Sequence, residues 1–164
     1  TRDSDGDEGR TTIFLNEWDL GTGERRIRMV TDEEGGSFAV GYHETAFFGQ
    51  YDEQSYTFAT PYGRVFRLDV QSARVTQLAT LPLAKPELRS ARFYVRDGYA
   101  YAIEPSEDGE APPQFSACRL SDGRCSTPKP LEGLEKKMRG SLLGGEQVLQ
   151  FFAVRPGYIP DIDS

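Results

Sequence analysis

Apolar and polar residues alternate along most of this 164-residue chain, and small or polar residues interrupt the alternation at short intervals. Alternation with a period of two predicts a β-strand with one buried and one exposed face, and a Gly-, Asp- or Ser-rich break predicts a turn. Seventeen glycines and ten prolines spread such breaks over the whole chain. The pattern therefore predicts an all-β fold made of many short strands.

One strand–turn–strand unit occurs three times. Its turns align without gaps when Leu20, Val70 and Leu120 are superposed, which places successive copies 50 residues apart. Repetition at a fixed spacing indicates a structural unit that is stacked several times. The three copies read TTIFLNEWDLGTGERRIRMV (11–30), RVFRLDVQSARVTQLATL (64–81) and QFSACRLSDGRCSTPKPL (114–131).

A second strand–turn–strand unit lies between these hairpins. Its copies read SFAVGYHETAFFG (37–49), ARFYVRDGYAYAIEP (91–105) and SLLGGEQVLQFFAV (141–154). Asp97-Gly98 and Gly144-Gly145 suit two-residue turns, because such turns need positive φ. In the second period the returning strand is either TAFFGQ (45–50) or YTFATP (56–61), and this choice moves YDEQ (51–54) from one end of the sheet to the other. Each period thus holds about four strands.

Four antiparallel strands in a period of about 40 to 50 residues are typical of a β-propeller blade. The stretches WDLGTGE (18–24) and FRLDVQSARVTQLATLP (66–82) resemble the hairpin between the third and fourth strands of bacterial kelch, quinoprotein and TolB-type propellers. The resemblance implies about three four-stranded antiparallel blades over residues 11–154. Residues 1–10 are then an acidic flexible tail, and residues 155–164 a C-terminal tail or linker. The paired glycines that close the second strands of kelch repeats are missing.

Two alternatives follow from the same pattern. A β-sandwich could be built from the same hairpins, since local strand and turn signals do not distinguish the two topologies. Three blades also leave a propeller ring incomplete, because closed rings have at least about four. Open sheet edges recruit other strands. We therefore expect further blades, either from the same polypeptide or from a second copy of the chain.

The charge pattern limits the classes of ligand. A net charge of −7 argues against nucleic acid, which needs clustered Lys and Arg. No apolar run reaches the roughly 18 residues of a membrane span. Asp3, Asp5 and Asp7 alternate as in the first half of a calcium loop, but the second half is missing, which favours a flexible tail over the alternative of a calcium site. His43 has no nucleophile motif to activate, which argues against catalysis there.

Cys118 and Cys125 are the only cysteines. Zinc sites commonly pair cysteines two to four residues apart, and redox sites use Cys-x-x-Cys; neither spacing is present. With Ser121-Asp122 at the turn, the two cysteines face each other across a hairpin, unless a bulge at Gly123 makes the pair diagonal. The sequence predicts a disulfide, and hence an extracytoplasmic location that is periplasmic, cell-surface or secreted.

Acidic and tyrosine-rich loops are the candidate binding residues. In a propeller the fourth-to-first and second-to-third connections share one face, where scaffolds place binding groups. We expect an acidic face for a cationic partner or a metal ion, with solvated surface loops as the alternative. The candidates are Asp32, Glu33, Glu34, Tyr51, Asp52, Tyr56, Tyr62, Glu107, Asp108 and Glu110.

The leading functional hypothesis is a non-catalytic exported module that binds a protein or glycan, basic partners included. The first alternative is an accessory propeller segment of a larger enzyme whose catalytic residues lie outside this chain. Quinone-dependent or galactose-oxidase-like oxidation is a third class. It requires cofactor-ligating His, Cys and aromatic residues at the propeller axis, and His43 alone does not supply that set.

Overall fold

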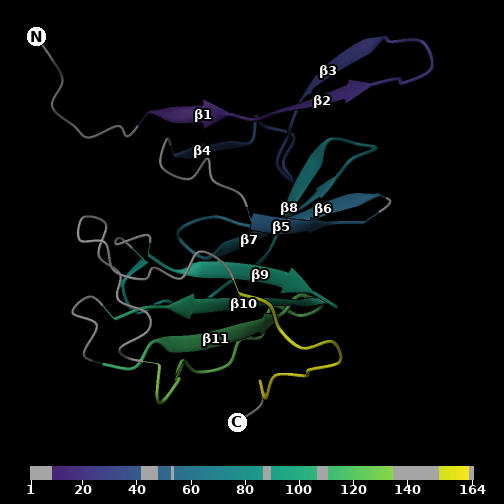
Figure 1. Ribbon diagram of the computed structural model, residues 1–164. Helices are drawn as coiled ribbons and strands as arrows, with labels where there is room; N and C mark the ends of the chain where they lie inside the picture. The colour runs from purple at the N-terminus through teal and green to yellow at the C-terminus, as the bar shows by residue number, and fades with distance from the viewer. Residues whose placement is uncertain are drawn as a thin grey trace, which may run out of the picture.

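A computed structural model describes residues 9–41, 48–52, 54–86, 90–106, 111–134 and 152–162. Twelve short strands and no α-helix occur in these ranges (Figure 1), which confirms the all-β prediction. The strands are β1 (Arg10–Thr12), β2 (Phe14–Trp18), β3 (Arg25–Met29), β4 (Ala39–Gly41), β5 (Phe48–Tyr51), β6 (Ser55–Ala59), β7 (Arg64–Asp69), β8 (Arg74–Thr80), β9 (Arg92–Arg96), β10 (Tyr99–Glu104), β11 (Gln114–Arg119) and β12 (Lys129–Pro130).

The strands form four antiparallel sheets. Two sheets have four strands each, in the orders β5-β6-β7-β8 and β9-β10-β11-β12, so that every strand pairs with its neighbours in sequence. The other two sheets are the pairs β2-β3 and β1-β4. The described strands thus contain two complete four-stranded meanders and one hairpin of the repeated unit, and no sheet among them closes into a barrel.

The hairpin repeat is confirmed in its geometry. Gly23, Ala73 and Gly123 occupy equivalent turn positions and have φ values of 74°, 55° and 71°. In the first and third copies the turn closes identically: the Gly23 amide donates to the Asp19 carbonyl at 2.7 Å, and the Gly123 amide donates to the Arg119 carbonyl at 2.9 Å. Glycine tolerates this left-handed conformation, whereas Ala73 adopts it with a Cβ.

The second repeated unit is only partly as expected. Residues 97–98 make the predicted tight turn between β9 and β10, with φ values of 52° at Asp97 and 81° at Gly98. The hairpin predicted over residues 37–49 is wrong, because β4 pairs with β1 and not with β5. The first four residues of YTFATP lie in β6, which pairs with β5, so YDEQ starts at the last residue of β5 and ends at the residue before β6. The Gly144-Gly145 turn lies outside the described residues.

The sheets stack face to face in three layers, with β1–β4 at one end, β5–β8 in the middle and β9–β12 at the other end (Figure 1). The middle sheet is buried on both faces, which explains why four of the five β6 residues are buried. One face packs on a cluster containing Val30, Phe38, Val40, Phe58, Phe66, Leu68 and Val75. The other packs on a cluster containing Ala59, Val65, Leu81, Phe93, Val95, Ala100, Ala102, Cys118 and Leu120.

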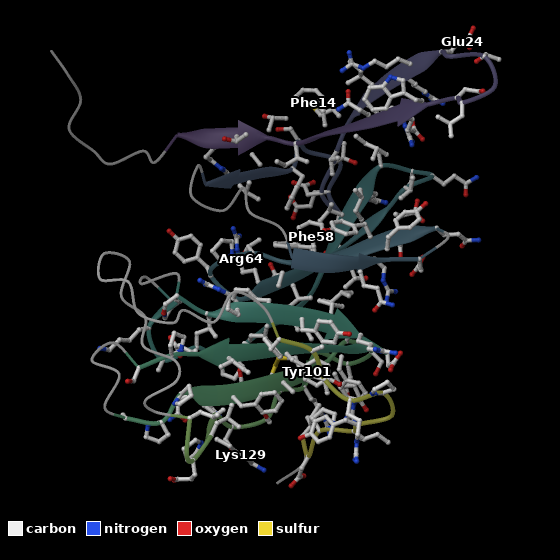
Figure 2. The ribbon with its side chains drawn as sticks, in the orientation of Figure 1. Phe14, Glu24, Phe58, Arg64, Tyr101 and Lys129 are labelled. Carbon is white, nitrogen blue, oxygen red and sulfur yellow. A yellow bond between two sulfur atoms is a disulfide. The ribbon has the colours of Figure 1, made fainter. Side chains whose placement is uncertain are left out.

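Residues 152–162 cover the outer face of the β9–β12 sheet. The ring of Tyr101, labelled in Figure 2, is 2% exposed and lies 6.4 Å from the ring of Tyr158. The Tyr101 hydroxyl donates to the Tyr158 carbonyl at 3.5 Å, and the rings of Tyr94 and Phe152 are 6.0 Å apart. This part of the expected C-terminal tail therefore packs against the fold.

Candidate functional site

The β2–β3 hairpin exposes an apolar face. Its strands alternate, so that Phe14 and Trp18 of β2 and Ile27 and Met29 of β3 point to the same side. These side chains are 53%, 57%, 53% and 45% exposed, respectively. In the described part of the molecule no other sheet packs over them, and Phe14 projects from the end of the stack in Figure 2. Monomeric soluble proteins rarely expose large contiguous apolar patches, so this cluster is the candidate site.

One cation belongs to the same face. The guanidinium of Arg25 lies 5.2 Å from the ring centroid of Trp18, its cross-strand partner. It also donates to Oδ1 of Asn16 at 2.5 and 3.2 Å. The cation–π contact with Trp18 and the hydrogen bonds to Asn16 hold the Arg25 side chain against the sheet. The face thus combines aromatic, aliphatic and arginine groups, which are enriched at the centres of protein interfaces.

Arg28 on the opposite face anchors the hairpin to the middle sheet. Its guanidinium binds both carboxylate oxygens of Glu17 at 2.8 and 2.9 Å, and this hydrogen bond holds the pKa of Glu17 below its ordinary value. The same group donates to the carbonyl of Gln71 at 2.6 Å and to that of Val70. Because these carbonyls belong to the β7–β8 turn, the hairpin has a defined orientation on that turn.

The acidic loop between β3 and β4 is internally hydrogen-bonded. Oδ1 of Asp32 accepts the amides of Glu34 at 3.1 Å and Gly36 at 2.7 Å. Arg74 donates to the carbonyls of Asp32 and Glu33, which places the loop beside the start of β8. The Asp32 carboxylate therefore shapes the loop, while the side chains of Glu33 and Glu34 are exposed.

The predicted tyrosines divide between the two ends of the middle sheet. Tyr51 and Tyr56 are cross-strand neighbours at the β5–β6 turn, and Tyr62 lies in the β6–β7 turn at the opposite end. The carboxylate of Asp52 accepts the Gln54 amide at 2.9 Å and others in the turn, and these bonds lower the pKa of Asp52. The structure thus brings Tyr51, Asp52 and Tyr56 together and separates Tyr62 from them. Glu107, Asp108, Glu110, His43, Asp3, Asp5 and Asp7 lie outside the described residues.

The predicted disulfide is present. Cys118 and Cys125 are bonded and directly opposite each other, with their Cα atoms 4.0 Å apart. The ladder bonds flank this pair, from Arg119 to Arg124 and from Ser126 to Ala117, so the cysteines form a non-hydrogen-bonded pair in which side chains approach closely. Cys118 is fully buried between the two four-stranded sheets. The geometry is that of a structural clamp.

Sequence reasoning missed Glu104, whose side chain is 6% exposed. Its two carboxylate oxygens accept the amides of Ala84 at 2.7 Å and Lys85 at 2.8 Å, which ties the β8–β9 connection to the end of β10. The residue borders a pocket of about 540 Å³ that Ser106 and Gln114 also line. Because both oxygens are engaged, Glu104 positions the backbone and is not placed as an acid or base. The sequence did contain a signal that Glu104 is buried. Glu104 in YAYAIEP corresponds to the buried Thr60 in YTFATP, and each of the two residues precedes a proline.

No three metal-binding side chains gather within the described ranges. The described residues also include no helix with the length and apolar character needed to traverse a bilayer. The comparisons with known proteins returned no matching family model, no similar curated protein and no similar solved structure.

Proposed function

We propose that this chain is a non-catalytic binding or assembly module of propeller-like repeats, which contacts a protein partner through the β2–β3 hairpin. The observation that carries the proposal is the exposed cluster of Phe14, Trp18, Ile27 and Met29. An exposed apolar cluster of this kind promotes aggregation. A partner that covers the cluster removes that liability.

The propeller-like arrangement is supported by strand order and stacking. Two successive four-stranded meanders pack face to face, and their third strands, β7 and β11, start 50 residues apart at Arg64 and Gln114. Sequential order within each sheet and a constant offset between sheets are properties of propeller blades. A sandwich of the same hairpins would more often exchange strands between its two sheets through Greek-key connections.

An extracytoplasmic location is supported by the disulfide between Cys118 and Cys125. Such bonds persist in oxidising compartments and are rare in the reducing cytosol. The polar groups near the hairpin favour binding over catalysis: Glu17, Arg28 and Asn16 are all engaged in contacts that build the hairpin. The groups that remain exposed on the hairpin are apolar side chains and Arg25, which are typical of protein interfaces.

Site-specific photo-crosslinking in the source cells tests this function. A photoreactive amino acid at Ile27 is expected to trap a defined protein, and the matched control position Thr127, exposed at the far end of the stack, is expected to trap none. Adding Trp18→Asp should abolish the adduct, because it introduces a charge at the centre of the apolar face. Absence of an adduct at Ile27, or equal adducts at both positions, would refute the proposed function.

A further inference from the structure

Among the strands that the structure describes, none pairs with one edge of the N-terminal strands β1 and β2. The Val30 amide donates to the Ile13 carbonyl at 3.0 Å, and the Ile13 amide donates to the Phe38 carbonyl at 3.2 Å. The amide and carbonyl of one strand residue point to the same edge, so β3 and β4 both lie on one side of β1 and β2. Within the described ranges no strand lies on the other side.

The residues that face this open edge follow from the alternation of the ladder. The Asp19 amide donates to the Glu24 carbonyl at 2.9 Å, so odd-numbered residues of β2 bond towards β3. The amides and carbonyls of Phe14, Asn16 and Trp18 therefore point outward at the open edge. Their side chains belong to the exposed face described above, so the backbone edge and the apolar face are continuous.

The other two copies of the repeat show what pairs at this edge. In β7, the Arg64 carbonyl accepts the Thr60 amide at 2.9 Å, which shows that the even-numbered residues bond to β6. In β11, the Leu120 amide donates to the Gly98 carbonyl at 2.8 Å, so the even-numbered residues again bond towards β10. Positions 14, 16 and 18 are the equivalents of these residues, 50 and 100 positions earlier. In both complete sheets an antiparallel second strand occupies the edge that β2 leaves open.

We propose that this edge of β2 binds an antiparallel strand from a second copy of the chain, formed by residues 148–154. This stretch reads VLQFFAV and is apolar on both faces except at Gln150. A strand between two neighbours in a stacked sheet is buried on both faces, as β6 and β10 are here. Apolar residues at both odd and even positions predict the same environment for residues 148–154.

The donor of the strand is a second copy because of where the segment starts in its own chain. Phe152 packs against Tyr94 on the outer face of β9, whereas β2 lies at the opposite end of the three-layer stack (Figure 1). A second copy could keep its own Phe152–Tyr94 contact while adding its strand to β2 of the first. Two chains exchanging strands in this way would bring together four four-stranded sheets and two β2–β3 sheets extended to three strands, and six sheets are within the usual blade number of propellers.

This inference rests on the assembly role proposed above, and the mass of the purified full chain in solution tests it separately. Light scattering is expected to give about 37 kDa, twice the 18.3 kDa of one chain. Asn16→Pro removes the outward amide and leaves the bonds to β3 intact, which an edge strand tolerates. It should weaken dimerisation by at least about tenfold, because ladder hydrogen bonds are lost. The matched control Asn16→Ala keeps the amide and should remain dimeric.

A second pair of variants is used if the circular dichroism of the Asn16→Pro chain shows that the monomer itself has lost β-structure. Leu149 corresponds to Ala102 when Gly144-Gly145 is aligned with Asp97-Gly98, and Ala102 pairs with Ser116, the equivalent of Asn16. Leu149→Pro is therefore expected to abolish the dimer and Leu149→Ala to retain it, since only proline removes an amide from the added strand. Chains carrying Asn16→Cys and chains carrying Leu149→Cys, mixed and oxidised, should form a mixed disulfide that Asn16→Cys with Thr127→Cys does not.

The outcomes separate the two proposals. A monomeric wild-type chain at high micromolar concentration, or a dimer that survives both proline substitutions, overturns the strand exchange. If the monomeric chain still forms an adduct with another protein at Ile27, the proposed function stands and only the strand exchange is wrong. If neither dimer nor adduct forms, both proposals are wrong.

Discussion

Glu104 offers the sharpest test of how the layers are joined. Its carboxylate accepts two backbone amides, from Ala84 and Lys85, and these bonds fix the connection that leads from the middle sheet to the next one. Glu104→Ala removes both acceptors, and Glu104→Gln keeps one carbonyl oxygen but places an NH₂ group against the other amide. The two variants therefore remove different numbers of bonds from one site.

The magnitude follows from the charge and the exposure of the partners. A hydrogen bond to a charged group contributes roughly 1.5–3 kcal/mol to the free energy of unfolding. Ala84 and Lys85 are exposed, so water replaces part of each lost bond and the lower end of the range applies. We expect a loss of about 3 kcal/mol for Glu104→Ala and about 1.5 kcal/mol for Glu104→Gln. For a chain of this length, about 3 kcal/mol corresponds to a Tm decrease of roughly 6–12 °C.

Urea unfolding followed by far-ultraviolet circular dichroism measures these differences from the midpoint and slope. The matched control is Glu132→Ala, which removes an exposed glutamate and should change stability by less than about 0.5 kcal/mol. The reasoning is refuted if Glu104→Ala is as stable as the control, or if Glu104→Gln is the less stable of the two variants.

Three further predictions concern other parts of the fold. Reduction of the Cys118–Cys125 disulfide, or its replacement by two alanines, should lower the free energy of unfolding by about 2 kcal/mol in urea titrations, because the closed loop is short. Gly49→Ala should destabilise by about 1–3 kcal/mol in the same assay, because a Cβ there would lie 2.2 Å from the Thr57 carbonyl oxygen. Burial raises the pKa of Tyr101 from 10.0 to about 12, so its contribution is complete below pH 10 and is lost as the pH rises towards 12. Alkaline melts of Tyr101→Phe should show a smaller loss of stability over that interval than wild type; equal losses would contradict the assignment.

Features that depend on a few neighbouring residues could be predicted from the sequence. The three equivalent turns at Gly23, Ala73 and Gly123 follow from local backbone chemistry, and the pairing of Cys118 with Cys125 follows from strand parity around such a turn. The all-β class has the same origin, because alternation and turn residues act within one hairpin. These properties need no knowledge of what packs on the hairpin.

The candidate site was predicted less completely. Of the acidic residues chosen from the sequence, Asp32 and Asp52 use their carboxylates to cap their own turns, which is what Asp does most often in loops. The order of the chain did not reveal that Ala39–Gly41 pairs with Arg10–Thr12, since strand partners are selected by the burial of side chains far apart in sequence.

The sequence by itself determined the repeat, its turns and the faces of each strand, because hydrogen bonding and side-chain alternation are local. Only the tertiary structure decided which faces are covered. Trp18 and Leu68 hold the same position in the repeat, yet Leu68 is buried between two layers and Trp18 is 57% exposed. Alternation separates two faces of a strand but contains no information about the neighbour that each face meets. The exposed hairpin, and the function proposed for it, therefore became visible only when the layers were assembled.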